Sequence, residues 1–115
     1  MLKIEMKFLR GILFVRLRGL LDKGTSKSFE NEVLPIILSN EIKYVVINLD
    51  SIKNIDDYGV ESLTKVDDII SNNKGRTALC SLTSKQVKSF LHKDIYQNMF
   101  YIAANELTAL GVINL

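Results

Sequence analysis

The segment Tyr44–Val60, YVVINLDSIKNIDDYGV, decides the fold of this 115-residue chain. Its first part, Tyr44–Leu49, is a dense apolar run rich in β-branched residues, which is typical of a central strand covered on at least one face. We interpret the polar stretch Asp50–Asp57 as a loop. Apolar residues then recur every three or four positions, which predicts a helix that packs back on the strand. This strand, loop and helix indicate an α/β protein.

The helix after Asp57 carries one apolar stripe and has a clear end. Asn72–Gly75 supplies the residues that commonly terminate a helix. A short strand is predicted directly after it, over Arg76–Ser81. The apolar stripe consists of Val60, Leu63, Val66, Ile69 and Ile70.

Three further elements are predicted toward the C-terminus. Thr83 and Gln86 have the spacing of a capping box, so a third helix is expected to begin there. Tyr96–Ile102 is predicted to be a last aromatic strand or extended segment. A short helix follows it, with Gly111 as its terminating residue.

The N-terminal third begins with a predicted hairpin. Apolar and polar residues alternate over residues 2–18 on both sides of a glycine-containing turn, which is a two-strand signal. A loop over Gly19–Gly24 then leads to a helix that begins at Thr25, a good N-cap residue, and ends near Asn40.

The predicted element order is β-β-α-β-α-β-α-β-α. Strands that alternate with helices favour a parallel core, and the opening hairpin adds antiparallel pairing. We therefore expect an α/β fold with a mixed sheet of four to five strands and about four helices. Residues 1–115 show no linker or repeat, so we expect one domain.

Composition excludes several classes of function. The 15 basic and 13 acidic residues are interspersed, without the basic stripe that binding to nucleic acid requires. We find neither a signal peptide nor an apolar run of about 20 residues, so we expect a cytoplasmic protein that does not insert into membranes. The lone Cys80, predicted to be buried, and the lone His92 cannot form a typical zinc site, and we expect no metal and no cofactor.

Three segments, in this order and spacing, resemble the STAS family, the anti-sigma-factor antagonists of bacteria. The resemblance covers nearly the whole chain and implies a compact mixed sheet with packed helices in a single STAS-like domain. The segments are Arg18–Asp22 with Thr25, Val45–Leu49 followed by Ile55–Val60, and Gly75–Phe90.

The resemblance implies a regulatory switch, but this chain departs from the family at the switch itself. In the family, a serine after a signature aspartate is phosphorylated by a partner anti-sigma factor that is a serine kinase. Carried over, the aspartate is Asp56, the phospho-acceptor serine is Asp57, and a second serine is Tyr58. Because Asp57 has no hydroxyl group, the usual phosphorylation cycle cannot operate.

Two hypotheses follow from this departure. A carboxylate at a helix start partly imitates a phosphoserine, so the chain could be locked in a phospho-like state. Alternatively, the partner has adapted to an acidic residue beside an aromatic one, and binding is constitutive. We favour the second hypothesis, because an exposed Tyr58 suits an interface anchor.

We therefore predict a protein-interaction module that binds an anti-sigma factor or serine kinase through two loops. The predicted contact residues are Asp22, Lys23, Gly24, Thr25, Asp56, Asp57, Tyr58, Gly59 and Ser62.

Two other classes of function are open to a chain of this kind. STAS domains also occur as subunits of scaffolds and of membrane-transport assemblies. An enzyme could use Asp50, Asp56 and Asp57 as a magnesium or acyl-phosphate site. The basic segment Arg16–Gly19 at the end of the hairpin disfavours that chemistry, and the glycines lack the pattern of a P-loop. We expect a protein that is not an enzyme.

Overall fold

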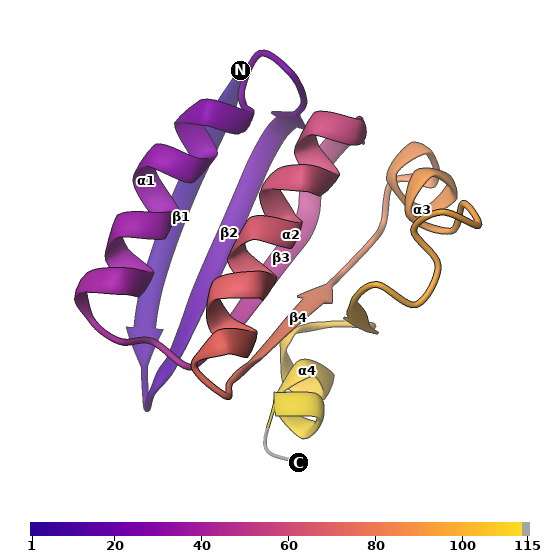
Figure 1. Ribbon diagram of the computed structural model, residues 1–115. Coiled ribbons are helices and arrows are strands. Elements are labelled where there is room, and N and C mark those ends of the chain that lie inside the picture. The colour runs from indigo at the N-terminus through magenta and orange to yellow at the C-terminus, as the bar shows by residue number, and fades with distance from the viewer. Residues whose placement is uncertain (114–115) are drawn as a thin grey trace.

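The computed structural model describes residues 1–113, which form a five-stranded mixed sheet and four helices in the predicted order (Figure 1). The predicted α/β fold class is confirmed. The elements are β1 (Leu2–Leu9), β2 (Ile12–Leu21), α1 (Ser26–Ser39), β3 (Tyr44–Ile55), α2 (Asp57–Asn72), β4 (Arg76–Cys80), α3 (Lys85–Leu91), β5 (Tyr101–Ala103) and α4 (Glu106–Ile113).

The strands lie in the sheet in the order in which they occur in the chain. β1 pairs with β2 in antiparallel orientation, and β2 to β5 are parallel to one another. The β1–β2 turn consists of Arg10 and Gly11, with φ values of 52° and 81°. Two successive positive φ values are typical of the tight hairpin turn that matches the twist of its strands. The parallel pairs need helical crossovers, which α1, α2 and α3 provide.

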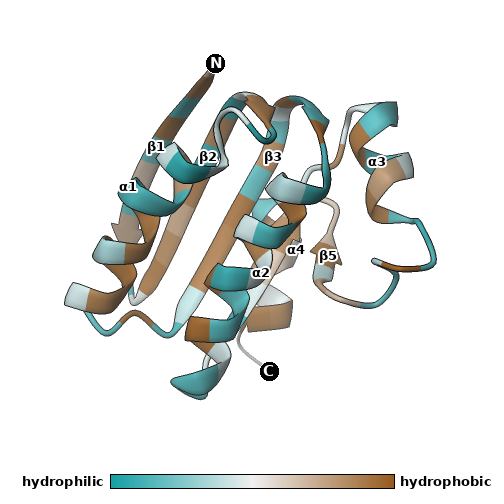
Figure 2. Ribbon diagram, turned by 45° about the horizontal axis from the view of Figure 1, so that its top comes forward, coloured by the Kyte–Doolittle hydropathy of each residue, from teal (hydrophilic) through white to brown (hydrophobic). Residues whose placement is uncertain are grey.

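The two faces of the sheet are covered unequally. α1 and α2 cover one face, where the larger apolar core includes Phe29 and Leu63, and α4 packs on the opposite face against Val46 and Ala78. Figure 2 shows the hydrophobic strands behind α1 and α2 and hydrophilic residues on the outward sides of both helices. The predicted alternation in the hairpin is confirmed, because Leu13 and its alternate neighbours lie in the larger core.

The predicted loop at Gly19–Gly24 is wrong in its first half, and the predicted loop at Asp50–Asp57 is wrong for most of its length. β2 continues to Leu21 and β3 continues to Ile55, and the two strands pair in parallel up to these residues. The physical reason is tertiary: Leu21, Ile52 and Ile55 are all buried in the larger core. Burial of these side chains and the continued ladder hydrogen bonds outweigh the polar local composition.

Three boundaries near the C-terminus also differ from the prediction. Ser84, and not Thr83, caps α3, because its Oγ accepts a hydrogen bond from the backbone N of Val87 at 3.4 Å. The Thr83 hydroxyl instead donates to the carbonyl of Asp50 at 2.9 Å. The last strand is shorter than predicted, and α4 continues through Gly111.

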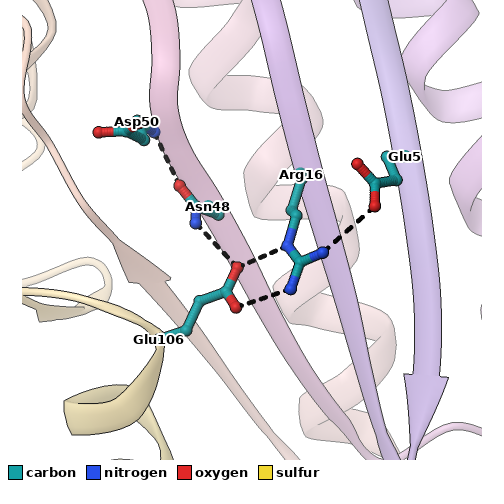
Figure 3. Close-up of polar contacts among 5 residues, drawn as sticks. All are labelled: Glu5, Arg16, Asn48, Asp50 and Glu106. Carbon is teal, nitrogen blue, oxygen red and sulfur yellow. Dashed lines mark hydrogen bonds and ion pairs between the residues drawn. The ribbon is translucent and has the colours of Figure 1, made fainter.

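A polar network joins α4 to the sheet (Figure 3). Nε and Nη2 of Arg16 in β2 donate to the two carboxylate oxygens of Glu106 at 2.9 and 3.0 Å, and Nη1 donates to Glu5 at 3.2 Å. The side-chain amide of Asn48 donates to Glu106 at 2.8 Å. The hydrogen bond from Arg16 is the main reason that the pKa of Glu106 lies below its usual value. This network fastens the first turn of α4 to β2 and β3.

The substitution Glu106→Gln is expected to lower the free energy of unfolding by about 1 kcal/mol at pH 7, because the Arg16 and Glu106 side chains are 40% and 24% exposed and solvent weakens their attraction. A lowered folded-state pKa stabilises the protein above the unfolded value of about 4.3, and this contribution is lost as the pH falls further. Urea unfolding at pH 7 and pH 3 measures the difference.

Glu32→Gln on the exposed side of α1 is the matched control and is expected to change little at either pH. An equal loss of stability for Glu106→Gln at both pH values would contradict the prediction.

Candidate functional site

Two loops meet at one edge of the sheet. β2 and β3 are parallel neighbours, so the residues that follow Leu21 and Ile55 leave the sheet at the same edge. Figure 1 shows α1 and α2 beginning side by side there, at the upper end of the sheet. The structure thus brings together the two predicted segments, residues 22–25 and the first turn of α2.

Asp56 joins the two segments. Its backbone is extended, with φ −126° and ψ −173°, and its side chain caps α2 by accepting a hydrogen bond from the backbone N of Gly59 at 3.0 Å. The second carboxylate oxygen accepts from the backbone N of Lys23, also at 3.0 Å. Both oxygens therefore satisfy backbone donors of the protein itself.

The loop at residues 22–25 is held by its own side chains. Asp22 accepts a hydrogen bond from the backbone N of Gly24 at 2.9 Å. The hydroxyl of Thr25 accepts from the backbone N of Asp22 at 3.0 Å and donates to the carbonyl of Leu20 at 2.9 Å. Thr25 occupies the N-cap position of α1 but makes no side-chain hydrogen bond to that helix. The predicted N-cap position of Thr25 is therefore confirmed, but its hydroxyl shapes the loop and does not bond to the helix.

Gly59 allows α2 to approach the end of β2. A Cβ atom on Gly59 would lie 2.2 Å from the carbonyl oxygen of Leu21 and 2.8 Å from the side chain of Ile55. Gly59 is buried, so it sets the position of the first turn of α2 without being accessible itself. Only a residue without a side chain fits this contact.

Asp57 and Tyr58 are the exposed side chains of the turn. Tyr58 is 49% exposed, and the Nζ atom of Lys23 lies 5.5 Å from the centre of its ring. This arrangement is a cation–π contact between the two segments. Asp57 is exposed in the first turn of α2, where the helix dipole favours a carboxylate.

Tyr96 is a neighbour of this turn that the sequence did not predict. It lies in the connection between α3 and β5, and its phenol donates a hydrogen bond to the carboxylate of Asp57. That hydrogen bond, together with burial and the negative charges of Asp57 and Asp56, raises the pKa of Tyr96 to about 12. The two residues are 39 positions apart in the chain, and no local pattern pairs them.

Ser62 is corrected from a predicted contact to an internal residue. Its side chain is fully buried, and its hydroxyl donates to Glu30 of α1 at 2.6 Å. Lys65 donates to the same carboxylate at 3.0 Å. Burial alone would raise the pKa of Glu30, but the hydrogen bonds from Ser62 and Lys65 outweigh it and lower the pKa. Ser62 therefore connects α1 to α2 and lies out of a partner's reach.

The carboxylates considered for a magnesium site are not assembled. Asp50 lies within β3, five residues before Ile55, which corresponds to roughly 16 Å of strand. Within residues 1–113, no group of three or more His, Cys, Asp or Glu side chains could hold a metal ion. Cys80 is buried as predicted, and burial raises the pKa of its thiol, so it is a poor nucleophile at neutral pH.

The fold and this sheet edge define a class of protein. It is a small α/β domain with an exposed aromatic side chain, Tyr58, and an exposed acidic side chain, Asp57, in the first turn of a helix. No helix within residues 1–113 is long and apolar enough to cross a membrane. Comparison with known proteins agrees with this class. Residues 3–109 match the STAS domain, and the chain belongs to that family.

Several of the similar proteins are anti-sigma factor antagonists. The chain is 28% identical over 109 residues to an anti-sigma F factor antagonist of Paenibacillus polymyxa, a match that covers 95% of this chain and 92% of the relative. A crystal structure of a putative anti-sigma factor antagonist from Thermotoga maritima superposes with a TM-score of 0.88 at 16% identity, over 97% of this chain and 95% of that one. Both matches extend over nearly the whole of this chain.

The antagonist SpoIIAA of Bacillus resembles this chain in both of its forms. The TM-score is 0.72 for the unphosphorylated form, at 18% identity over 97% of this chain and 98% of that one. It is 0.71 for the phosphorylated form, at 17% identity over 96% and 99%. The backbone of this chain is therefore about equally similar to both forms.

The substitution Gly59→Ala is expected to lower the free energy of unfolding by roughly 1–3 kcal/mol, because the new methyl group would overlap the carbonyl oxygen of Leu21. Gly111→Ala is the matched control. Gly111 lies in α4, and a methyl group added there would meet no atom within 4 Å, so alanine should stabilise the helix by up to roughly 1 kcal/mol. Thermal unfolding measures both, and equal effects would contradict the prediction.

Proposed function

We propose that this chain acts in the cytoplasm, as one STAS-like domain, by binding an anti-sigma factor or a related serine-kinase regulator through the edge formed by residues 22–25 and the first turn of α2. The observation that carries the proposal is the exposed Tyr58, which lies beside Lys23 because Asp56 accepts hydrogen bonds from the backbone N atoms of both Lys23 and Gly59. A tyrosine held in this way contributes a large contact area and loses little entropy on binding.

The internal hydrogen bonds support a preformed docking surface. Asp22 and Thr25 form hydrogen bonds that hold the loop at residues 22–25 in shape, Asp56 joins this loop to the first turn of α2, and Gly59 fixes the approach of α2. A partner then contacts Lys23, Gly24 and Tyr58 without having to order the loops first. A preformed surface avoids part of the entropy that binding otherwise loses.

The proposed binding is constitutive with respect to serine phosphorylation. We take Asp57 as the position that corresponds to the phospho-acceptor serine of the family, and a carboxylate there cannot accept a phosphoryl group from a serine kinase. The anti-sigma F factor antagonist of Paenibacillus polymyxa supports the assignment of the partner class. Binding is expected to be the same with or without ATP turnover by the partner.

The substitution Tyr58→Ala is expected to weaken binding to the cognate anti-sigma factor at least about tenfold, because a central aromatic anchor contributes about 2 kcal/mol or more. Tyr101→Ala is the matched control, since Tyr101 in β5 is 56% exposed but lies outside the proposed surface. Isothermal titration calorimetry measures both affinities. Absence of binding by the native chain in every nucleotide state would contradict the proposed function.

The double substitution Asp57→Ser with Tyr58→Ser restores the two hydroxyl groups that the family carries at these positions. We expect the partner kinase to phosphorylate this variant in the presence of ATP and to leave the native chain unmodified, as measured by intact mass. The single substitution Tyr58→Ser is the control that lacks the acceptor at position 57. Phosphate on the native chain at this turn would contradict the proposed loss of the switch.

A further inference from the structure

The connection between α3 and β5, residues 92–100, contacts the first turn of α2 through Tyr96. The phenol of Tyr96 donates a hydrogen bond to the carboxylate of Asp57, which bridges these two parts of the chain. The connection is ordered by its own backbone: the N atoms of Tyr96 and Gln97 donate to the carbonyl of Lys93 at 2.9 and 2.8 Å, and that of Met99 donates to Tyr96 at 3.2 Å. A turn with internal hydrogen bonds thus contacts the proposed docking surface.

Packing fixes the ring of Tyr96. It stacks on Phe90 of α3 with the ring centres 5.5 Å apart and the planes inclined by 29°. Tyr96, Phe90 and Phe100 all pack against the larger core of the protein. The Nζ atom of Lys93 lies 3.9 Å from the centre of the Phe90 ring and adds a cation–π contact to this cluster. Because the ring is anchored, the phenol is held in place and is not a freely moving group.

Asp57 is the matching acceptor on the other side. Its side chain is exposed at the start of α2, and the pKa of Tyr96 is raised chiefly because Asp57 accepts the hydrogen bond from its phenol. A carboxylate oxygen extends one bond further from the backbone than a serine hydroxyl does. A serine at this position would leave the phenol without its charged acceptor, and charge-assisted hydrogen bonds are the stronger kind.

We infer that Asp57 is a positioning residue: with Tyr96 it ties residues 92–100 to the first turn of α2, and this makes the segment a third part of the docking surface beside Lys23 and Tyr58. Asp57 then acts through the segment it holds and not as an imitation of phosphoserine. The part of the inference that concerns docking rests on the proposed function. The tie itself, which is the hydrogen bond between Asp57 and Tyr96 that holds residues 92–100 against α2, does not.

Hydrogen exchange tests the tie in the isolated protein. Tyr96→Phe removes only the hydroxyl and keeps the stacked ring, and Asp57→Ala removes the acceptor. Each is expected to speed amide exchange in residues 92–100 on the order of fivefold, and the double variant should be no faster than either single one, since both break the same bond. Tyr101→Phe is the matched control. Unchanged exchange in Tyr96→Phe, or additive effects, would overturn the inference.

Ultraviolet titration of the phenols gives a second measurement. The native protein should contain one tyrosine that titrates near pH 12 and is absent from Tyr96→Phe, and in Asp57→Ala that group should titrate at a clearly lower pH, because the main cause of its raised pKa is removed. A raised pKa stabilises the folded state below about pH 10, and the effect disappears as the pH rises toward 12. Titration of every tyrosine near pH 10 in the native protein would overturn the tie.

Binding to the anti-sigma factor separates the tie from the docking proposal. If residues 92–100 belong to the docking surface, Tyr96→Phe and Asp57→Ala should each weaken binding by a similar factor, on the order of fivefold. Tighter binding by Asp57→Ala would overturn the inference in favour of a phosphoserine-like repulsion. Altered exchange together with no binding by any form would support the tie and contradict only the proposed function.

Discussion

The parallel pairing of β2 with β3 is the constraint on which the rest of the structure depends. It extends from the pair Ile12 and Tyr44 to the pair Leu21 and Ile55, so both strands end at the same edge of the sheet. The loop at residues 22–25 and the first turn of α2 must therefore meet, although more than 30 positions separate them in the chain. Asp56 then converts this proximity into a fixed geometry by accepting hydrogen bonds from both segments.

Two neighbouring carboxylates at this edge serve different purposes because their surroundings differ. Asp56 is extended ahead of the helix and directs both oxygens at backbone N–H groups, so it is part of the framework. Asp57 is one residue further on, within the helix, and its side chain points to the surface and to Tyr96. A helix start favours acidic residues at both positions. The direction of each side chain decides that Asp56 is part of the framework and that Asp57 lies at the surface.

The remaining polar groups show the same division between framework and surface. Ser62 and Glu30 bond to each other between α1 and α2, and Arg16 and Glu106 fasten α4 to the opposite face of the sheet. The α4 face has a smaller apolar core than the α1 and α2 face, so a bidentate ion pair there supplements the packing. Side chains with no such internal partner, Tyr58 above all, are the ones offered to other molecules.

The sequence alone determined the element order and the apolar stripe of α2, because these follow from local periodicity. The two segments of the candidate site were predicted from the resemblance to the STAS family. The second half of β3 was not predicted as a strand because its composition is polar. Burial of Ile52 and Ile55 against neighbouring elements makes that half a strand. The tertiary structure alone decided that Ser62 is internal and that Tyr96 reaches Asp57. Contacts between residues so far apart in the chain depend on how helices and loops pack on the sheet, which local sequence does not encode.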